Sequence, residues 1–175
     1  METARLDVAI LLGSDTDKPA FENSKMTDIL DACGVSYEVS TLSGDRNDEE
    51  LGPFCQQKLE EGVKVFIAIA GLINVLGGAV EAKIKWTRPV LAVGLGGETL
   101  GGLASLFSIT FKPRGTPVAG MGMDKHGLCN AAWFAAQIVA LTDAGVARRF
   151  DDAVNANLPP VRIGWLKSRQ RQEGA

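Results

Sequence analysis

Two short polar stretches, "GSDTD" and "SGDRN", carry residue types that bind phosphorylated sugars. In the first, Ser14 and the free backbone N–H groups of a turn can hold an anion, and the Asp17 carboxylate can accept hydrogen bonds from ribose hydroxyls. In the second, Ser43 adds a hydroxyl, and Arg46 adds a guanidinium suited to bidentate contact with phosphate. The chemistry that these residues predict is binding of a ribose phosphate.

Both stretches also have an ordinary structural interpretation. Ser, Thr and Asp are common helix N-cap residues, so "GSDTD" is equally typical of a plain helix start, and taken alone it favours the cap. Arg46 can be a surface arginine that pairs with Asp48 or Glu49. The residue types by themselves leave both interpretations open.

The segments around these stretches alternate between apolar strand patterns and helical patterns. We expect strands at 5–13, 35–41, 63–71, 89–95 and 116–123. We expect helices from Pro19 to Cys33, from Asn47 or Asp48 to Glu61, near 76–85, at 127–141 and at about 143–157. Such alternation is typical of a parallel sheet with helices on both faces, whose ligands bind at the carboxyl ends of the strands. Both polar stretches directly follow predicted strands.

The length of 175 residues favours one domain. We therefore expect an α/β fold with a single nucleotide-binding domain over 1–158. Pro159–Pro160 ends the last predicted helix, and a C-terminal helical tail is expected over 159–175.

Composition excludes several classes of function. The net charge of −3 argues against a nucleic-acid partner, because no basic face is implied. The most apolar stretch, 65–80, contains Asn74 and three glycines and is shorter than a membrane span requires, so no membrane partner is expected.

The cysteines and the single histidine favour neither a metal site nor a nucleophile. Cys33, Cys55 and Cys129 are far apart, and with only His126 available no zinc site is expected. Cys55 is interpreted as a packing residue and His126 as a residue near a helix start. An odd number of cysteines behind an N-terminus that is too short and acidic for export predicts reduced thiols in a cytoplasmic protein. No metal and no cofactor are predicted.

Taken together, five stretches resemble one enzyme family of purine biosynthesis. "GSDTD" corresponds to the family pattern G-S-x-S-D, "SGDR" to S-A-H-R, and "AGLINVLGG" to A-G-x-x-x-H-L-P-G. The stretch 105–123 follows S-L-x-S-I-x-x-x-P-x-G-x-P-V, and "NAAWFAAQIVAL" follows N-A-A-x-x-A-A-x-I-L. This pattern, over about residues 6–142, resembles the catalytic subunit of phosphoribosylaminoimidazole carboxylase, also known as carboxyaminoimidazole ribonucleotide mutase.

The resemblance implies a fold, an activity and an assembly. The implied fold is a flavodoxin-like three-layer α/β sandwich with a central parallel sheet. The implied activity is carboxylation or carboxyl transfer on 5-aminoimidazole ribonucleotide, which makes the chain a lyase (carboxylase) or an isomerase. The expected partners are a small-molecule ribonucleotide, carbon dioxide or bicarbonate, and further copies of the chain in a homo-octamer with sites at subunit contacts.

The resemblance also assigns roles to individual residues. It implies phosphate and ribose binding by Ser14, Asp17, Ser43 and Arg46. The loop that resembles the cover over the aminoimidazole ring and the carboxyl group contributes Gly71, Asn74 and Leu76.

Both family histidines are replaced. The histidine of S-A-H-R, which shuttles a proton while the carboxyl group moves onto ring carbon, is Asp45 here, and the histidine before L-P-G is Val75. Asp45 is therefore the candidate catalytic residue, although a carboxyl that titrates near pH 3.9 is poorly matched to proton transfer at pH 7. The branch that uses free carbon dioxide has A-G-R-S-N-x-L in the third loop. Asn74 and Leu76 fit that branch, whereas Leu72–Ile73 replace its Arg-Ser.

Three functions remain open at this point. The first is carboxylation or carboxyl transfer on aminoimidazole ribonucleotide, with Asp45 carrying the proton. The second is a non-catalytic homologue that binds ribonucleotides, and the third is a related enzyme that acts on a different heterocyclic nucleotide. The motifs favour the first, and the replaced histidines count against it.

Overall fold

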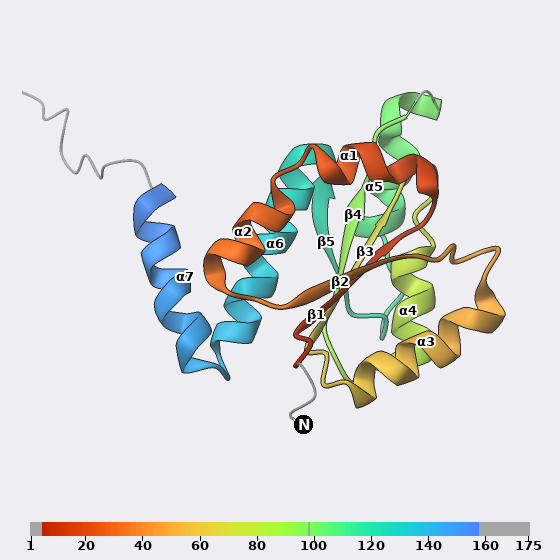
Figure 1. Ribbon diagram of the computed structural model, residues 1–175. Coiled ribbons are helices and arrows are strands. Elements are labelled where there is room, and N and C mark those ends of the chain that lie inside the picture. Colours follow the sequence, from red (N-terminus) through yellow and green to blue (C-terminus); the bar gives the residue numbers. More distant parts are fainter. Residues whose placement is uncertain (1–4, 98, 158–175) are drawn as a thin grey trace, which may run out of the picture.

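Five parallel strands form the central layer of the molecule (Figure 1). The computed structural model describes residues 5–97 and 99–157. The strands are β1 (Val8–Leu12), β2 (Tyr37–Thr41), β3 (Val65–Ala70), β4 (Val90–Gly94) and β5 (Val118–Met123), and their order in the sheet is β2-β1-β3-β4-β5. Each neighbouring pair is parallel. This order is that of a flavodoxin-like fold.

Helices cover both faces of the sheet. One face carries α1 (Lys18–Glu22), α2 (Met26–Cys33) and α6 (Asp124–Ala140), and the other carries α3 (Asp48–Glu60), α4 (Leu76–Ile84) and α5 (Leu103–Thr110). The helix α7 (Ala144–Asn157) packs outside α2 and α6, as Figure 1 shows. Two short 3-10 helices, η1 (Asp15–Asp17) and η2 (Thr99–Gly102), lie in the loops after β1 and β4. The predicted three-layer sandwich is confirmed.

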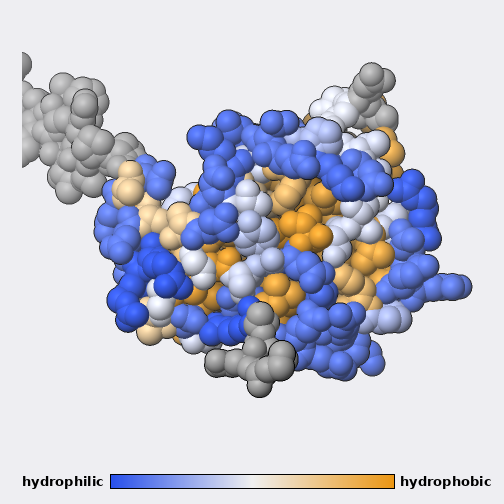
Figure 2. Space-filling model, viewed as in Figure 1, coloured by the Kyte–Doolittle hydropathy of each residue, from blue (hydrophilic) through white to orange (hydrophobic). Residues whose placement is uncertain are grey.

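The three central strands are apolar because helices bury both of their faces. All five residues of β1 and of β4 are buried, as are the first five residues of β3. Figure 2 shows hydrophilic residues along the outer sides of α1 and α3, with hydrophobic residues in the layer between them. Continuous apolar runs of this kind are typical of buried parallel strands, which is why they could be located from the sequence.

The helix predicted from Pro19 to Cys33 is wrong as one element, because the chain breaks into α1 and α2. The break centres on Ser24, whose buried hydroxyl donates to the Phe21 carbonyl at 2.6 Å and accepts from the Met26 N–H at 3.1 Å. Lys25 then adopts a left-handed conformation, with φ of 65°. Hydrogen bonds from a serine side chain to nearby backbone compete with helix geometry in this way. The predicted stop at Gly34 is confirmed, with φ of 66°.

The helix α5 was not predicted. It follows the glycine-rich loop after β4 and begins behind Gly102, whose φ of 82° suits only glycine well. No side-chain cap marks its start, and its β-branched residues Ile109 and Thr110 have modest helix propensity. Sequence patterns therefore indicated no helix there. In the structure, α5 lies beside the loop 71–76, to which Ser108 is hydrogen-bonded.

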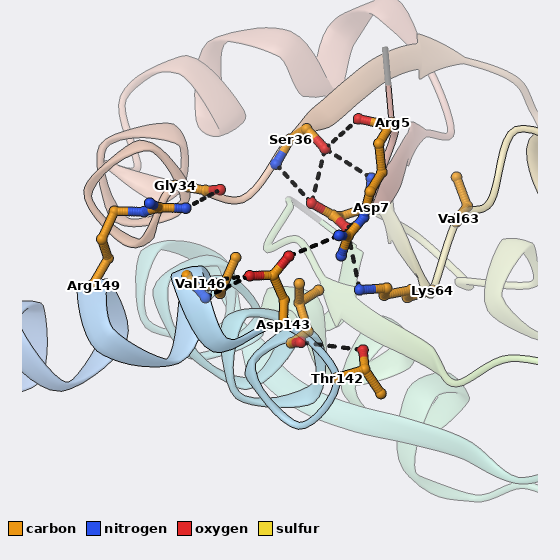
Figure 3. Close-up of polar contacts among 12 residues, drawn as sticks. Arg5, Asp7, Gly34, Ser36, Val63, Lys64, Thr142, Asp143, Val146 and Arg149 are labelled. Carbon is orange, nitrogen blue, oxygen red and sulfur yellow. Dashed lines mark hydrogen bonds and ion pairs between the residues drawn. The ribbon is translucent and has the colours of Figure 1, made fainter. Parts of the chain in front are cut away.

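A polar cluster ties the amino end of β1 to the junction of α6 and α7 (Figure 3). The Arg5 guanidinium contacts the Asp7 carboxylate at 2.9 Å and the Asp143 carboxylate at 2.7 Å. Asp7 also accepts from the Ser36 hydroxyl at 2.9 Å, and Lys64 lies 3.5 Å from it. Every charge here has a partner within the chain, so this end of the sheet is organised for stability. The predicted tail over 159–175 lies outside the described residues.

Candidate functional site at the carboxyl edge of the sheet

The two polar stretches, 13–17 (the first loop) and 43–47 (the second loop), meet at the carboxyl edge of the sheet. They follow β1 and β2, which are neighbours in the sheet, and the Arg46 guanidinium donates to the Gly13 carbonyl at 3.3 Å. Arg46 is exposed and forms no ion pair with Asp48, whose carboxylate pairs with Lys83 at 2.8 Å. The interpretation of Arg46 as an ion-pair partner of Asp48 or Glu49 is therefore wrong within the described residues, and its guanidinium reaches the first loop instead.

The first loop orders its polar side chains around the short helix η1. The Ser14 hydroxyl oxygen accepts from the Thr16 N–H at 3.3 Å and from the Thr16 hydroxyl at 3.0 Å, so the predicted N-cap is confirmed. Ser14 remains half-buried at the edge of the loop. The cap fixes the hydroxyl in place, and a hydroxyl that accepts can still donate its own proton to a ligand.

Asp17 is buried although it is charged. The pKa of its carboxyl is raised, chiefly by burial, and the nearby backbone of Ser14 and the positive charge of Arg46 partly offset this rise. A carboxyl at this place can accept hydrogen bonds from a pair of hydroxyls. Asp17 and Arg46 therefore belong to one electrostatic unit built from two loops.

The second loop is a tight turn built around Ser43. The buried Ser43 hydroxyl accepts from the N–H groups of Asp45 and Arg46, each at 3.3 Å. The Asn47 side chain accepts from the Ser43 N–H at 3.0 Å and so closes the turn. These bonds fix the backbone from which the exposed side chains of Asp45 and Arg46 project.

Gly44 places the second loop directly against the third. A Cβ atom at this position would lie 3.0 Å from the Leu76 Cα and 3.1 Å from the Val75 side chain. This approach brings the backbone of Asp45 next to the start of α4. The loops after β2, β1 and β3 thus converge at one edge, as the sequence predicted.

The third loop, 71–76, presents apolar side chains outward. Leu72 and Ile73 are 69% and 61% exposed, and Leu72 adopts a left-handed conformation with φ of 48°. A leucine in this conformation is strained, and such strain is frequent in loops that contact ligands. Gly71 packs near Leu95 at the end of β4, which anchors the loop to the next strand.

Asn74 and Leu76 face the interior. Leu76 is buried in the core formed with α3, and Asn74 is fully buried. The Asn74 amide donates to the Val93 carbonyl at 2.9 Å and to the Ala68 carbonyl at 3.4 Å, and its oxygen accepts from the Gly77 N–H. These side chains hold the third loop in place from the interior.

Replacing Asn74 by alanine is expected to lower the free energy of unfolding by about 1–3 kcal/mol, because two buried carbonyls and one N–H lose their partner. The measurement is urea denaturation of the variant beside Asn130→Ala, a change at an exposed position of α6. Equal stability of the two variants would contradict the positioning role.

Three residues at this edge were missed by sequence reasoning. The Ser108 hydroxyl accepts from the Asn74 N–H at 2.8 Å, and the Ser105 hydroxyl donates to the Ala70 carbonyl at 3.1 Å. The Asp124 carboxylate accepts from the Gly96 N–H at 2.6 Å. The i, i+3 spacing of the two serines would have placed them on one face of a helix, had α5 been expected.

The remaining chemistry-bearing residues do not form a second centre. Cys33 and Cys55 are buried as free thiols, and burial raises the pKa of Cys55 to about 11, as befits a packing residue. His126 is exposed in the first turn of α6, near the helix start as predicted. Within 5–97 and 99–157, no group of three His, Cys, Asp or Glu side chains is arranged to hold a metal ion. Nor does this part of the chain contain a helix of the length and apolarity needed to cross a membrane.

Comparison with known proteins agrees with this geometry. The family model described as AIR carboxylase matches residues 7–157. The N5-carboxyaminoimidazole ribonucleotide mutase of Bacillus subtilis is 37% identical over 145 residues, which is 83% of this chain and 87% of that protein. The enzyme of the same name from Escherichia coli K12 is 36% identical over 83% of each chain.

A solved structure shows the same similarity at the level of the fold. The crystal structure of Treponema denticola PurE superposes with a TM-score of 0.76 at 26% identity, covering 87% of this chain and 92% of that one. With a family match over most of its length and relatives above 30% identity, the chain belongs to the AIR carboxylase family.

Proposed function

We propose that this protein moves a carboxyl group onto the ring carbon of an aminoimidazole ribonucleotide in purine biosynthesis, as an isomerase of the N5-carboxyaminoimidazole ribonucleotide mutase type. The observation that carries this proposal is the junction of the first two loops. There the exposed Arg46 and the buried Asp17 form one unit beside two serine hydroxyls, Ser14 and Ser43. The names of the relatives supply the reaction class.

The proposed ligand contacts follow from the charges of the site. The Arg46 guanidinium and the hydroxyls of Ser14 and Ser43 bind the 5′-phosphate, and the Asp17 carboxylate accepts from ribose hydroxyls. The ring then lies toward the third loop, between Asp45 and the backbone from Gly71 to Leu76. The exposed apolar side chains of that loop help to exclude water from the ring.

The reaction requires one proton carrier. In a shift of carboxyl from nitrogen to ring carbon, the N–C bond breaks, a C–C bond forms, the ring carbon loses a proton and the nitrogen gains one. No proton is consumed overall, so one side chain that accepts and then returns a proton is sufficient. We assign this role to Asp45, which projects from the turn that Ser43 fixes.

The test is turnover with two substrates. We expect the N-carboxylated ribonucleotide to be converted, and 5-aminoimidazole ribonucleotide with bicarbonate to react slowly. Reaction with the second substrate alone would assign the chain to the carboxylase branch. Saturable binding of both without turnover would contradict the enzyme and favour the binding homologue, for which the loss of both family histidines is the supporting observation.

We further propose a homo-oligomer, an octamer by family resemblance, with the site close to a subunit contact. Leu103, Phe107 and Phe111 are 50%, 50% and 73% exposed and lie four residues apart, on one face of α5 and its C-cap. The two phenylalanine rings stack with centroids 5.5 Å apart. An exposed apolar stripe of this kind supports an interaction surface on α5, which also contacts the third loop.

Replacing Phe107 and Phe111 together by serine is expected to reduce the assembly to smaller species, because the stripe loses two aromatic side chains that a partner would bury. Multi-angle light scattering at micromolar concentration measures the mass. Phe134→Ser is the control, since Phe134 is 40% exposed on α6, on the opposite face of the sheet. A monomeric wild type, or an unchanged mass in the double variant, would contradict this surface.

A further inference from the structure

Glu81 in α4 is a buried carboxyl without a partner. Only 1% of the residue is exposed, and neither carboxylate oxygen has a hydrogen bond. Within the described ranges 5–97 and 99–157, these two oxygens are the only buried side-chain polar atoms in this condition. Burial raises the pKa of the Glu81 carboxyl. A buried polar group without a partner costs stability, so its presence needs an explanation.

A cavity of about 500 Å³ adjoins Glu81. Its walls come from the last turns of α4 and from the segment Gly115–Thr116 that leads to β5. A second cavity, of about 250 Å³, shares Trp86 and the same segment. Because α4 runs back from the carboxyl edge, its end lies at the opposite edge of the sheet from the phosphate loops. The larger of the two is by itself large enough for a small organic ligand.

Trp86 lines both cavities and is held open to solvent. It is 66% exposed, and both Lys85 and Trp86 have positive φ, at 51° and 62°. Two consecutive non-glycine residues in the left-handed region are strained. This turn ends α4 and carries the indole away from the core to a position where it can cover a ligand.

Negative charge at this end comes from α4 itself. The carbonyl groups at the end of a helix carry partial negative charge, and Glu81 adds a carboxylate to them. An indole face attracts cations as well. Two lysines are nearby, since Lys85 lines the cavity and the Lys112 amine lies 3.6 Å from a Cβ built on Gly78. Neither lysine forms an ion pair with Glu81 in the described part of the chain.

We propose that this cavity binds a planar cation of the guanidinium or amidinium class, with Glu81 accepting two parallel N–H groups and Trp86 stacking on the plane. Two free carboxylate oxygens match two parallel N–H donors, which an ammonium group does not offer. A guanidinium also stacks on aromatic rings and is more weakly hydrated than an ammonium, so it enters a buried site more easily. The exposed Lys85 and Trp86 side chains move aside to admit it.

The test uses agmatine as the guanidinium probe and butylamine as a cation that lacks the planar N–H pair. Calorimetric titration of the whole protein should show saturable binding of agmatine, tighter than that of butylamine by about tenfold or more. Glu81→Gln and Trp86→Leu should each weaken agmatine by about tenfold or more. Glu49→Gln, at an exposed position of α3, should leave it unchanged.

Several results would overturn the proposal. They are the absence of saturable agmatine binding, equal affinity for butylamine, and unchanged agmatine affinity in Glu81→Gln. A second copy of the chain that fills the cavity would overturn it as well, and this occupant would show as agmatine binding only in the Phe107→Ser, Phe111→Ser variant or on dilution. Turnover on the ribonucleotide is a separate readout, so failure here is distinguishable from failure of the proposed function.

Thermal unfolding gives a second, independent measurement. Without ligand, Glu81→Gln is expected to raise the melting temperature, because the variant removes a carboxyl whose ionised form is destabilised by burial without a partner. Agmatine should raise the melting temperature of the wild type and not that of Glu81→Gln, since a ligand stabilises only the state that binds it. A lower melting temperature for Glu81→Gln with no effect of agmatine on either protein would show a structural role instead.

Discussion

Asp45→Asn is expected to lower the rate of carboxyl transfer about 10²–10⁴-fold while ribonucleotide affinity stays nearly unchanged. Asparagine keeps the size and the hydrogen-bonding capacity of aspartate but removes the group that titrates. The backbone at this position is fixed by the bond from the Asp45 N–H to the Ser43 hydroxyl, which the substitution does not touch. The rate is measured at saturating N-carboxylated ribonucleotide, and affinity is measured separately by calorimetry.

Two variants make this result interpretable. Glu50→Gln removes a nearby exposed carboxyl at the start of α3 and should leave the rate unchanged. Asp45→His restores the family residue and should preserve or improve turnover if the rest of the site is intact. Full activity of Asp45→Asn would show that another group carries the proton. Inactivity of both the wild type and Asp45→His would favour a different substrate or a binding protein.

The fold could be predicted where local sequence and tertiary environment agree. The strands β1, β3 and β4 are buried on both faces, so each is a continuous apolar run. Gly34 sits in the left-handed conformation that ends α2, where a glycine is the expected residue. The convergence of the loops followed from the parallel sheet, because carboxyl ends of neighbouring strands share one edge.

The two errors in the predicted helices, the missed break between α1 and α2 and the missed helix α5, share a physical cause. The break at Ser24 depends on a buried hydroxyl that bonds backbone on both sides, and the helical spacing of the surrounding residues does not reveal it. The helix α5 is stabilised by packing against β4 and β5 rather than by a cap or by propensity. In both cases the deciding interactions come from tertiary structure.

The motifs also did not reveal which side chains point into the core. The pattern around residues 71–76 assigned Asn74 and Leu76 to the cover of the ring, but both side chains point into the interior. Glu81 gives the opposite case: a charged residue in a helix suggests a solvated face, and only the packing of α4 shows that it is buried. A motif identifies which residues stand in a loop, and the fold decides whether side chain or backbone faces the ligand.

Arg46→Ala is expected to weaken the binding of any 5′-phosphorylated ribonucleotide by about 1.5–3 kcal/mol, or about 10–150-fold. The guanidinium is exposed, and its only hydrogen bond in the described part of the chain goes to the Gly13 carbonyl at 3.3 Å. Its loss should therefore leave folding nearly unchanged. The effect on binding should be large, because the phosphate loses its cation.

The measurement compares a 5′-ribonucleotide with its unphosphorylated nucleoside by calorimetry, in the wild type, in Arg46→Ala and in Arg148→Ala, an exposed change on α7. If Arg46 binds the phosphate, only the ribonucleotide loses affinity in Arg46→Ala, and the loss shrinks as salt screens the charge. Arg46→Lys keeps a cation but not the planar fork, so it should recover part of the affinity.

Arg46→Ala should also change how ribonucleotide binding depends on pH. Removing Arg46 takes away a charge that lowers the pKa of Asp17, so the pKa of this buried carboxyl rises further in the alanine variant. Ribose contacts should then weaken at mildly acid pH, where Asp17 takes up a proton, in Arg46→Ala more than in the wild type. Unchanged affinity for every 5′-phosphorylated ligand tested would remove Arg46, and the site built around it, from the phosphate role.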